Sequence, residues 1–242
     1  MKPNKNLLLI SNSTHFGRGY LDHVEDEIRD FLGSTKSILF IPYALHDQDG
    51  FAAKALERFK DFGYELTSIH KSSDPARALK QADSIFIGGG NTFRLLNRLY
   101  ELELLEPIRQ RVAGGMPYIG ASAGSNVAGP TIKTTNDMPI VEPPSFTALG
   151  LVNFQLNPHY LDSDPKTTHM GETREERLLQ YLEDNDTPVV ALREGSLLRI
   201  ENEKVLLKGF TRARIFQKGI EPMEIEPGTE VVFEGGDLKY GT

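Results

Sequence analysis

Short apolar runs alternate with segments of helical periodicity through the first half of the chain, and this alternation restricts the fold more than any other feature. The runs expected to form strands are residues 7–10, 38–41, 66–69, 84–87 and 117–119. Between them apolar side chains recur every three or four residues, as at Leu21, Val24 and Ile28. Apolar strands separated by amphipathic helices are typical of βαβ units. The sequence therefore predicts an α/β fold, with a mostly parallel sheet and helices on both faces.

The rest of the chain has a different pattern. We expect a C-terminal antiparallel extension, as an edge or a satellite sheet, because short apolar stretches there are separated by turn residues. These stretches are residues 197–200, 205–207, 213–216, 223–225 and 231–233. Residues 130–164 are the least regular, and long loops around one short strand at 151–156 are expected. The 242 residues contain no repeat or linker, so we expect one domain, residues 1–242.

Composition excludes several kinds of chemistry. The chain has no cysteine, which rules out disulfides, cysteine-ligated zinc, iron–sulfur clusters and a cysteine nucleophile. Its 27 basic and 34 acidic residues give a net charge of −7, so we expect no nucleic-acid partner. The run at 7–10 is too short for a signal peptide, and no run approaches the roughly 20 apolar residues of a membrane span. A cytoplasmic protein without a membrane partner is expected.

The sharpest local motif is Gly-Ala-Ser-Ala-Gly at residues 120–124, a G-x-S-x-G match directly after an expected strand. In this context the serine of the motif sits on a sharp strand-to-helix turn with its hydroxyl exposed. Ser122 is therefore a candidate nucleophile, and the backbone N–H of Ala123 a candidate donor to a developing oxyanion. The alternative is a purely structural glycine-rich turn.

A serine nucleophile needs a base, and the candidates are His15, His23, His46, His70, His159 and His169. We favour His159, because it follows an apolar strand, and parallel sheets place their sites at strand ends. We expect His23, beside acidic residues, to be a solvated surface residue, whereas spacing does not exclude His15, His46 or His70. His169 and Glu172 resemble a metal pair, but no third ligand is well spaced, so no metal is expected.

A second glycine-rich junction, Gly-Gly-Gly-Asn-Thr at residues 88–92, follows another expected strand. It lacks the lysine of a P-loop and the spacing of a dinucleotide fingerprint. We expect Gly89 and Gly90 to supply a second oxyanion N–H opposite the serine turn. Asn91 or Thr92 is alternatively a helix N-cap, and the two roles are compatible.

Six motifs occur in order along the chain, at residues 9–14, 88–93, 118–124, 134–139, 157–159 and 171–174. With them the sequence resembles the peptidase E family, the α-aspartyl dipeptidases, over nearly its whole length. The resemblance implies a flavodoxin-like fold related to class I glutamine amidotransferases. It also implies a serine peptidase that removes an N-terminal aspartate from small peptides (Asp-X dipeptides) without metal or cofactor. We expect a monomer or a homodimer.

The resemblance also implies roles for individual residues. Ser122 would be the nucleophile and His159 the base. Either Glu194 or Asp137 would orient the histidine, and we favour Glu194 because a residue at a strand end is held more rigidly than one on a long loop.

Substrate recognition is expected to involve Arg174, which would bind the aspartate side chain, and Asn91. Arg174 is alternatively a helix-surface residue paired with the neighbouring Glu175 or Glu176. Ala121 departs from the larger residue expected before the serine, which would widen the substrate pocket.

Three competing functions remain. A cyanophycinase-like peptidase shares the serine turn but cleaves a branched Asp–Arg polymer. An α/β-hydrolase esterase usually places its acid before its histidine in the chain, so an acid at Asp137 would favour it. A non-catalytic binding module of the same fold would leave Ser122 unreactive.

Overall fold

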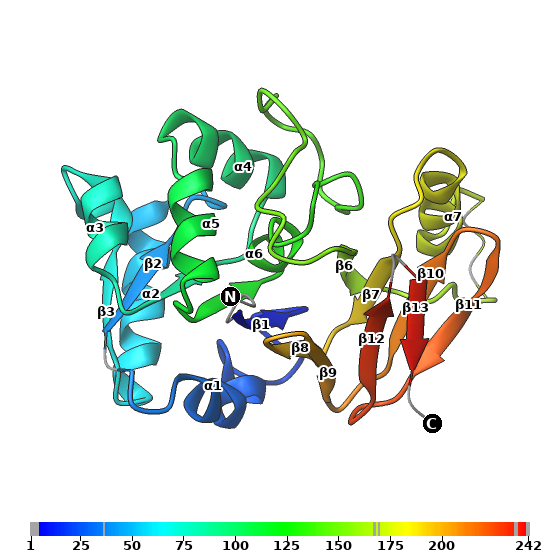
Figure 1. The fold of residues 1–242 in the computed structure, drawn as a ribbon, viewed down its shortest axis with the longest axis horizontal. Helices are drawn as coiled ribbons and strands as arrows, with labels where there is room; N and C mark the ends of the chain where they lie inside the picture. Colours follow the sequence, from blue (N-terminus) through cyan, green and yellow to red (C-terminus); the bar gives the residue numbers. More distant parts are fainter. Residues whose placement is uncertain (1–4, 36, 167, 169, 235–236, 241–242) are drawn as a thin grey trace.

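The structure is a computed structural model that describes residues 5–35, 37–166, 168, 170–234 and 237–240. Its strands form two sheets (Figure 1). The larger contains β1 (Asn6–Ile10), β2 (Ser37–Ile41), β3 (Glu65–Ser68), β4 (Ser84–Ile87), β5 (Tyr118–Ala121), β8 (Ser196–Glu201), β9 (Lys204–Gly209), β12 (Glu230–Glu234) and β13 (Asp237–Tyr240), in the order β13-β12-β9-β8-β1-β5-β4-β2-β3. The smaller contains β6 (Gln155–Tyr160), β7 (Val189–Arg193), β10 (Ala213–Gln217) and β11 (Ile220–Ile225), in the order β11-β10-β7-β6.

Helices cover both faces of the parallel part of the larger sheet. They are α1 (Glu25–Leu32), α2 (Gln48–Asp61), α3 (Pro75–Gln81), α4 (Thr92–Glu101) and α5 (Leu105–Ala113), with the short 3₁₀ helices η1 (Asp22–Val24) and η2 (Ile69–Lys71). Leu8 and Ile10 of β1 pack in the core formed with α1 and α2. Their neighbour Leu9 packs in the opposite core, formed with α3, α4 and α5. Because β-strand side chains alternate between faces, one continuous apolar strand fills two cores. The predicted α/β architecture is confirmed.

The C-terminal strands are antiparallel, as expected, but they divide between the two sheets. β8 pairs with β1 and extends the larger sheet through β9, β12 and β13. β10 and β11 instead join β7, which pairs in parallel with β6. The extension is therefore an edge of one sheet and half of a satellite sheet.

The strand expected at 151–156 was misplaced, because β6 begins at Gln155. Leu151 and Phe154 are buried, which produced the apolar pattern, but they lie in a loop that packs on the core. The Leu151 N–H donates to the Ala128 carbonyl, so its backbone pairs with the turn after the short helix α6 (Ala123–Asn126) instead of with a strand. An apolar run records burial, and burial alone does not distinguish a strand from a packed loop.

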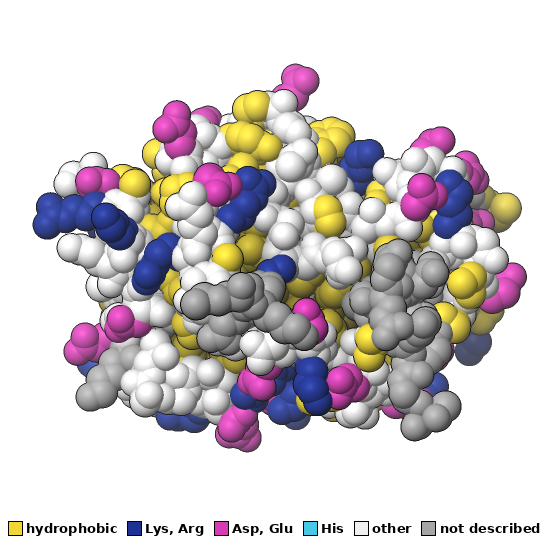
Figure 2. Space-filling model, in the orientation of Figure 1, with side chains coloured by type: hydrophobic (Ala, Val, Ile, Leu, Met, Phe, Trp, Pro, Cys, Tyr) yellow, Lys and Arg dark blue, Asp and Glu magenta, His cyan; other side chains and the backbone are white. Residues whose placement is uncertain are grey.

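The surface carries both signs of charge. On the face shown in Figure 2, acidic and basic side chains are interspersed and the described residues form no continuous basic field. Within the described part of the chain, no helix has the length and apolarity to cross a bilayer.

Candidate active site

Ser122 lies at a strained turn between β5 and α6. Its backbone has φ +52° and ψ −107°, a region that side-chain-bearing residues rarely adopt and that is concentrated at functional sites. The turn is held closely: a Cβ on Gly124 would collide with the Ile87 carbonyl of β4, and the Tyr118 hydroxyl donates to the Gly124 carbonyl over 2.6 Å. This constraint projects the Ser122 hydroxyl from the sheet edge into a cleft.

His159 lies within β6, at an irregularity in the pairing with β7. The register shifts between Pro158 and Tyr160, and His159 itself has φ +55°. Such a bulge re-aims a side chain that a regular strand would direct elsewhere. The His159 Nε2 atom lies 3.0 Å from Ser122 Oγ. Because Ser122 follows β5 of the larger sheet and His159 belongs to the smaller, the pair joins the two sheets.

Glu194 directly follows β7 and completes the chain of hydrogen bonds. Its Oε1 atom lies 2.8 Å from His159 Nδ1. Asp137, the other acid considered, has a different contact: its Oδ2 accepts hydrogen bonds from the N–H of Thr92 over 2.7 Å and from the Thr92 hydroxyl over 2.6 Å. Asp137 thus caps the start of α4, and it also lines the cleft beside Ser122. The structure joins Ser122, His159 and Glu194.

The end of β1 connects these three segments. The backbone N–H of Ser122 donates to the Ile10 carbonyl over 2.9 Å. The Ser11 hydroxyl donates to the Leu192 carbonyl over 2.8 Å and accepts the His159 N–H over 3.0 Å. The next residue, Asn12, accepts the N–H of Gly195 over 2.8 Å. These two fully buried polar side chains were not predicted. Their signal is their place directly after a strand, at the sheet edge that carries Ser122.

We predict that Ser11→Ala lowers kcat about tenfold for the substrate proposed below while its KM changes little. The substitution removes the partners of a buried N–H and a buried carbonyl, which also costs about 1–3 kcal/mol of stability. Steady-state kinetics and thermal unfolding measure the two effects. Ser145→Ala, on an exposed loop, is the matched control. A loss of stability with unchanged kcat would reduce Ser11 to a structural role.

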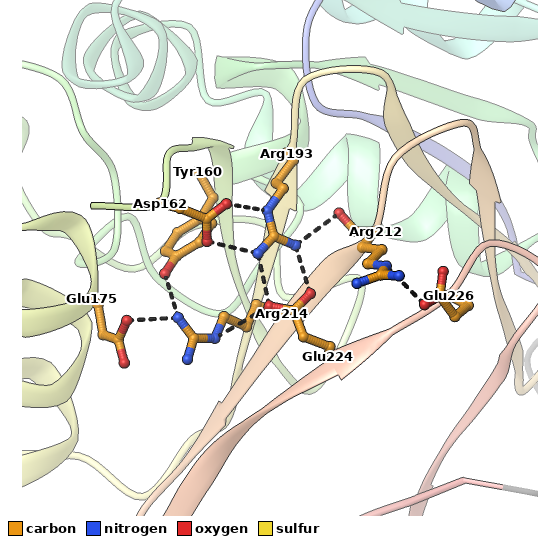
Figure 3. A network of polar contacts seen from close by, with 8 residues as sticks. All are labelled: Tyr160, Asp162, Glu175, Arg193, Arg212, Arg214, Glu224 and Glu226. Atoms are coloured by element: carbon orange, nitrogen blue, oxygen red, sulfur yellow. Dashed lines mark hydrogen bonds and ion pairs between the residues drawn. The ribbon is translucent and has the colours of Figure 1, made fainter. Parts of the chain in front are cut away.

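Arg193, the last residue of β7, binds two carboxylates at once (Figure 3). Its guanidinium binds the Asp162 carboxylate through two hydrogen bonds of 2.7 Å, and the Glu224 carboxylate through bonds of 2.7 and 2.8 Å. The hydrogen bonds to Asp162 contribute most to the raised pKa of Arg193, followed by those to Glu224. The hydrogen bond from Arg193 in turn lowers the pKa of Asp162. The two-sided clamp thus ties β7 to the segment after β6 and to β11.

Three backbone amides around the serine turn and the cleft remain candidate oxyanion donors. The structure gives the N–H groups of Gly89, Gly90 and Ala123 no hydrogen-bond acceptor among the described residues. Gly89 lies so close that a Cβ there would be 3.1 Å from Ser122 Cβ and 3.7 Å from Ser122 Oγ. Buried backbone donors almost always have partners, so unpaired amides around a nucleophile indicate a place for a developing negative charge.

The cleft around Ser122 has a volume of about 570 Å³. Its lining comprises Ser13, Tyr20, Leu45, Asp47, Gly50, Phe51, Lys54, Gly89, Gly90, Ser122, Asp137 and His159. Ala121 is absent from this lining, because its side chain is buried in the core beneath α1 and α2. The expectation that a small residue at this position widens the pocket is therefore wrong.

The two predicted substrate-binding residues, Asn91 and Arg174, differ in whether their polar groups are already bonded to other residues. Asn91 is the N-cap of α4, accepting the N–H of Arg94 and donating to the Met138 carbonyl, so both ends of its amide are engaged. Arg174 begins α7 (Arg174–Asp184) and is half-buried, with no hydrogen bond or ion pair recorded to a described residue. Burial lowers its pKa, Arg177 adds to this, and the charge of Asp137 opposes it. Arg174 itself is outside the cleft lining and is linked to the cleft through the charge of Asp137.

The alternative partners of Arg174 are engaged elsewhere. Glu175 pairs with Arg214 over 2.6 Å, and Glu176 forms the capping box of α7 with Thr173. The helix-surface pairing considered for Arg174 is absent among the described residues.

Four other described histidines, His15, His23, His46 and His70, do not line the cleft and have no hydrogen bond to Ser122. His70 bonds Ser68 and Asp49, and His46 is exposed outside the cleft lining. His23 is half-buried against His15. The expected solvated surface role of His23 is wrong: both its ring nitrogens are buried, and burial, more than the charges of His15 and Arg18, lowers its pKa.

The metal pair considered above is not described in full, because His169 lies outside the described residues. Among those that are described, no three His, Asp or Glu side chains gather as metal ligands.

A serine at a strained strand–helix turn, bonded to a histidine that a carboxylate holds, is the arrangement of serine hydrolases. The chain matches the model of Peptidase family S51 over residues 7–208. It is 53% identical over 240 residues to "Peptidase E" of Streptomyces coelicolor, covering 98% of this chain and 99% of that protein. It therefore belongs to peptidase family S51.

Two further likenesses extend over the chain. It is 44% identical to the "Probable alpha-aspartyl dipeptidase" of Drosophila melanogaster over 236 residues, covering 96% of this chain and 98% of that protein. The crystal structure of a peptidase from an acI-B1 Actinobacterium superposes with a TM-score of 0.71 at 18% identity, covering 96% of this chain and 99% of the other. At that identity the likeness concerns the fold, which is the one described above.

Proposed function

We propose that this chain is a serine dipeptidase that hydrolyses dipeptides with an N-terminal aspartate. The observation that carries the proposal is the hydrogen-bonded chain from Ser122 through His159 to Glu194 in a cleft that also holds unpaired amides. The names of the relatives from Streptomyces and Drosophila support the substrate class.

In this mechanism His159 Nε2 accepts the Ser122 proton as the hydroxyl attacks the carbonyl of the first substrate residue. Glu194 orients the imidazole through Nδ1 and stabilises its charged form. The amides of Gly89, Gly90 and Ala123 bind the oxyanion. The protonated His159 then gives its proton to the leaving amine, and a water that His159 deprotonates releases the acyl group from Ser122.

Selection of aspartate needs a cation on the acyl side of the scissile bond. Arg174 supports this role, because its guanidinium is half-buried, lacks a described carboxylate partner and senses the charge of Asp137. The planar fork of arginine binds a carboxylate with two parallel hydrogen bonds. We assign the substrate ammonium group to Asp137, which lines the same cleft.

A dipeptide panel tests the function directly. Asp-Leu should be cleaved in preference to Glu-Leu and Ala-Leu, and blocking the amine of Asp-Leu should abolish cleavage. Hydrolysis of the branched Asp–Arg polymer in place of Asp-Leu would favour the cyanophycinase-like alternative. The contact of His159 with Glu194, which follows it in the chain, disfavours the esterase order.

We predict that Arg174→Ala lowers kcat/KM for Asp-Leu about 100-fold while the value for Ala-Leu changes less than threefold. The expected loss is that of a charge-assisted pair with the substrate side chain. Competition between the two peptides in one reaction measures the ratio. Arg177→Ala, an exposed arginine on the same helix, is the control. Equal losses on both peptides would remove Arg174 from substrate selection.

A further inference from the structure

Lys54 lines the cleft around Ser122, and the described lining contains no other lysine or arginine. It lies on α2 and is exposed, with its Nζ 4.6 Å from the centre of the Tyr20 ring. An ammonium group over an aromatic face is attracted to it, which confines an otherwise flexible side chain to this wall of the cleft.

No carboxylate among the described residues pairs with Lys54, whereas neighbouring cations are paired. Arg58, one turn further along α2, binds Asp22 over 2.7 Å and Glu25 over 2.9 Å. The acidic residue that shares the cleft wall, Asp47, accepts the N–H of Gly50 over 2.8 Å and caps α2. Within the described chain, the charge of Lys54 is thus left without a counterion.

The tyrosine beneath Lys54 has an unpaired polar group of its own. Tyr20 is 7% exposed, and its buried hydroxyl has no hydrogen-bond partner. Burial raises the pKa of this hydroxyl, so it stays a neutral donor. A buried donor without an acceptor is costly. This hydroxyl belongs to Tyr20, a residue of the cleft wall whose ring lies under the Lys54 ammonium group.

An Asp-X dipeptide has three charges to place around one scissile bond. Two of them, the ammonium group and the side-chain carboxylate, belong to the acyl residue, and Asp137 and Arg174 are the groups proposed above to bind them. The third, the terminal carboxylate, belongs to the leaving residue. We propose that Lys54 binds this terminal carboxylate and thereby selects peptides of two residues.

The proposal rests on the dipeptidase function proposed above and adds the reason for the length limit. Each further residue moves the terminal carboxylate by about 3.3–3.6 Å. A longer peptide therefore presents a neutral amide to Lys54 and loses the charged contact. Binding of the terminal carboxylate by Lys54 leaves the reaction proposed at Ser122 unchanged.

Paired substrates isolate the contact. Asp-Leu and aspartyl-leucinamide differ in the terminal group, so wild-type protein should prefer the acid about 10- to 100-fold in kcat/KM, mainly through KM. Lys54→Gln should reduce this preference to less than threefold while hydrolysis of the amide changes little. Lys60→Gln, an exposed lysine near the end of the same helix, should keep the wild-type preference.

Two results would overturn the proposal, and they are distinguishable. If Lys54→Gln keeps the preference, or loses activity equally on both substrates, the carboxylate contact is absent and the dipeptidase function stands. If the wild-type chain cleaves neither substrate, the dipeptidase function fails and the Lys54 site fails with it.

Discussion

Replacing Ser122 by alanine is expected to lower kcat/KM for Asp-Leu by about 10³- to 10⁶-fold. The substitution removes the atom that forms the acyl-enzyme, so only positioning and the amides of Gly89, Gly90 and Ala123 remain to accelerate hydrolysis. Binding should survive, because Arg174 and Asp137 are untouched. Hydrolysis followed by chromatography, with calorimetric binding of Asp-Leu to the variant, measures both effects.

A covalent probe makes the same prediction independent of substrate choice. A fluorophosphonate should label the wild-type chain at Ser122 and leave Ser122→Ala unlabelled. Ser145→Ala, on an exposed loop, should label like wild type. Labelling that persists in Ser122→Ala would place the nucleophile elsewhere, and absence of labelling in the wild type would favour a binding module.

The first half of the fold could be predicted from sequence because its strands are continuous apolar runs. Parallel strands buried on both faces, such as β1 and β4, have little polar sequence to confuse the pattern. The division of the C-terminal strands between two sheets could not be predicted. β9 and β10 are both short strands that mix apolar with polar or charged residues, and which sheet each joins depends on tertiary pairing that periodicity does not encode.

The candidate site likewise contains some residues that the sequence could predict and others that it could not. Ser122 and Gly89 follow strands in glycine-rich turns, so local sequence is sufficient to point to them. Ser11, Arg193 and Lys54 act through contacts with residues distant in the chain, as in the 148-residue separation between Ser11 and His159. A common serine, arginine or lysine has no local signal that reports such a contact.

The second large effect concerns Glu194 and Asp137, the two carboxylates that the family resemblance offered as the acid that orients His159. Glu194→Gln is expected to lower kcat about 10³- to 10⁴-fold, because an amide neither stabilises the imidazolium nor enforces the tautomer that presents a bare Nε2 to Ser122. Asp137→Asn is isosteric and retains an acceptor for the Thr92 N–H and hydroxyl. It should raise KM through the substrate ammonium contact, with kcat lowered less than tenfold.

Comparing kcat between these two variants separates an orienting acid from a binding acid, since both substitutions keep size and remove one negative charge. Thermal unfolding serves as the control for folding, and Glu194, which is 48% exposed, is expected to show the smaller change in stability. A kcat near wild type in Glu194→Gln, together with a thousandfold loss in Asp137→Asn, would reverse the assignment. That reversal would require the cleft to rearrange on substrate binding, because in this structure the Asp137 carboxylate is bonded to the start of α4 and the His159 Nδ1 atom to Glu194.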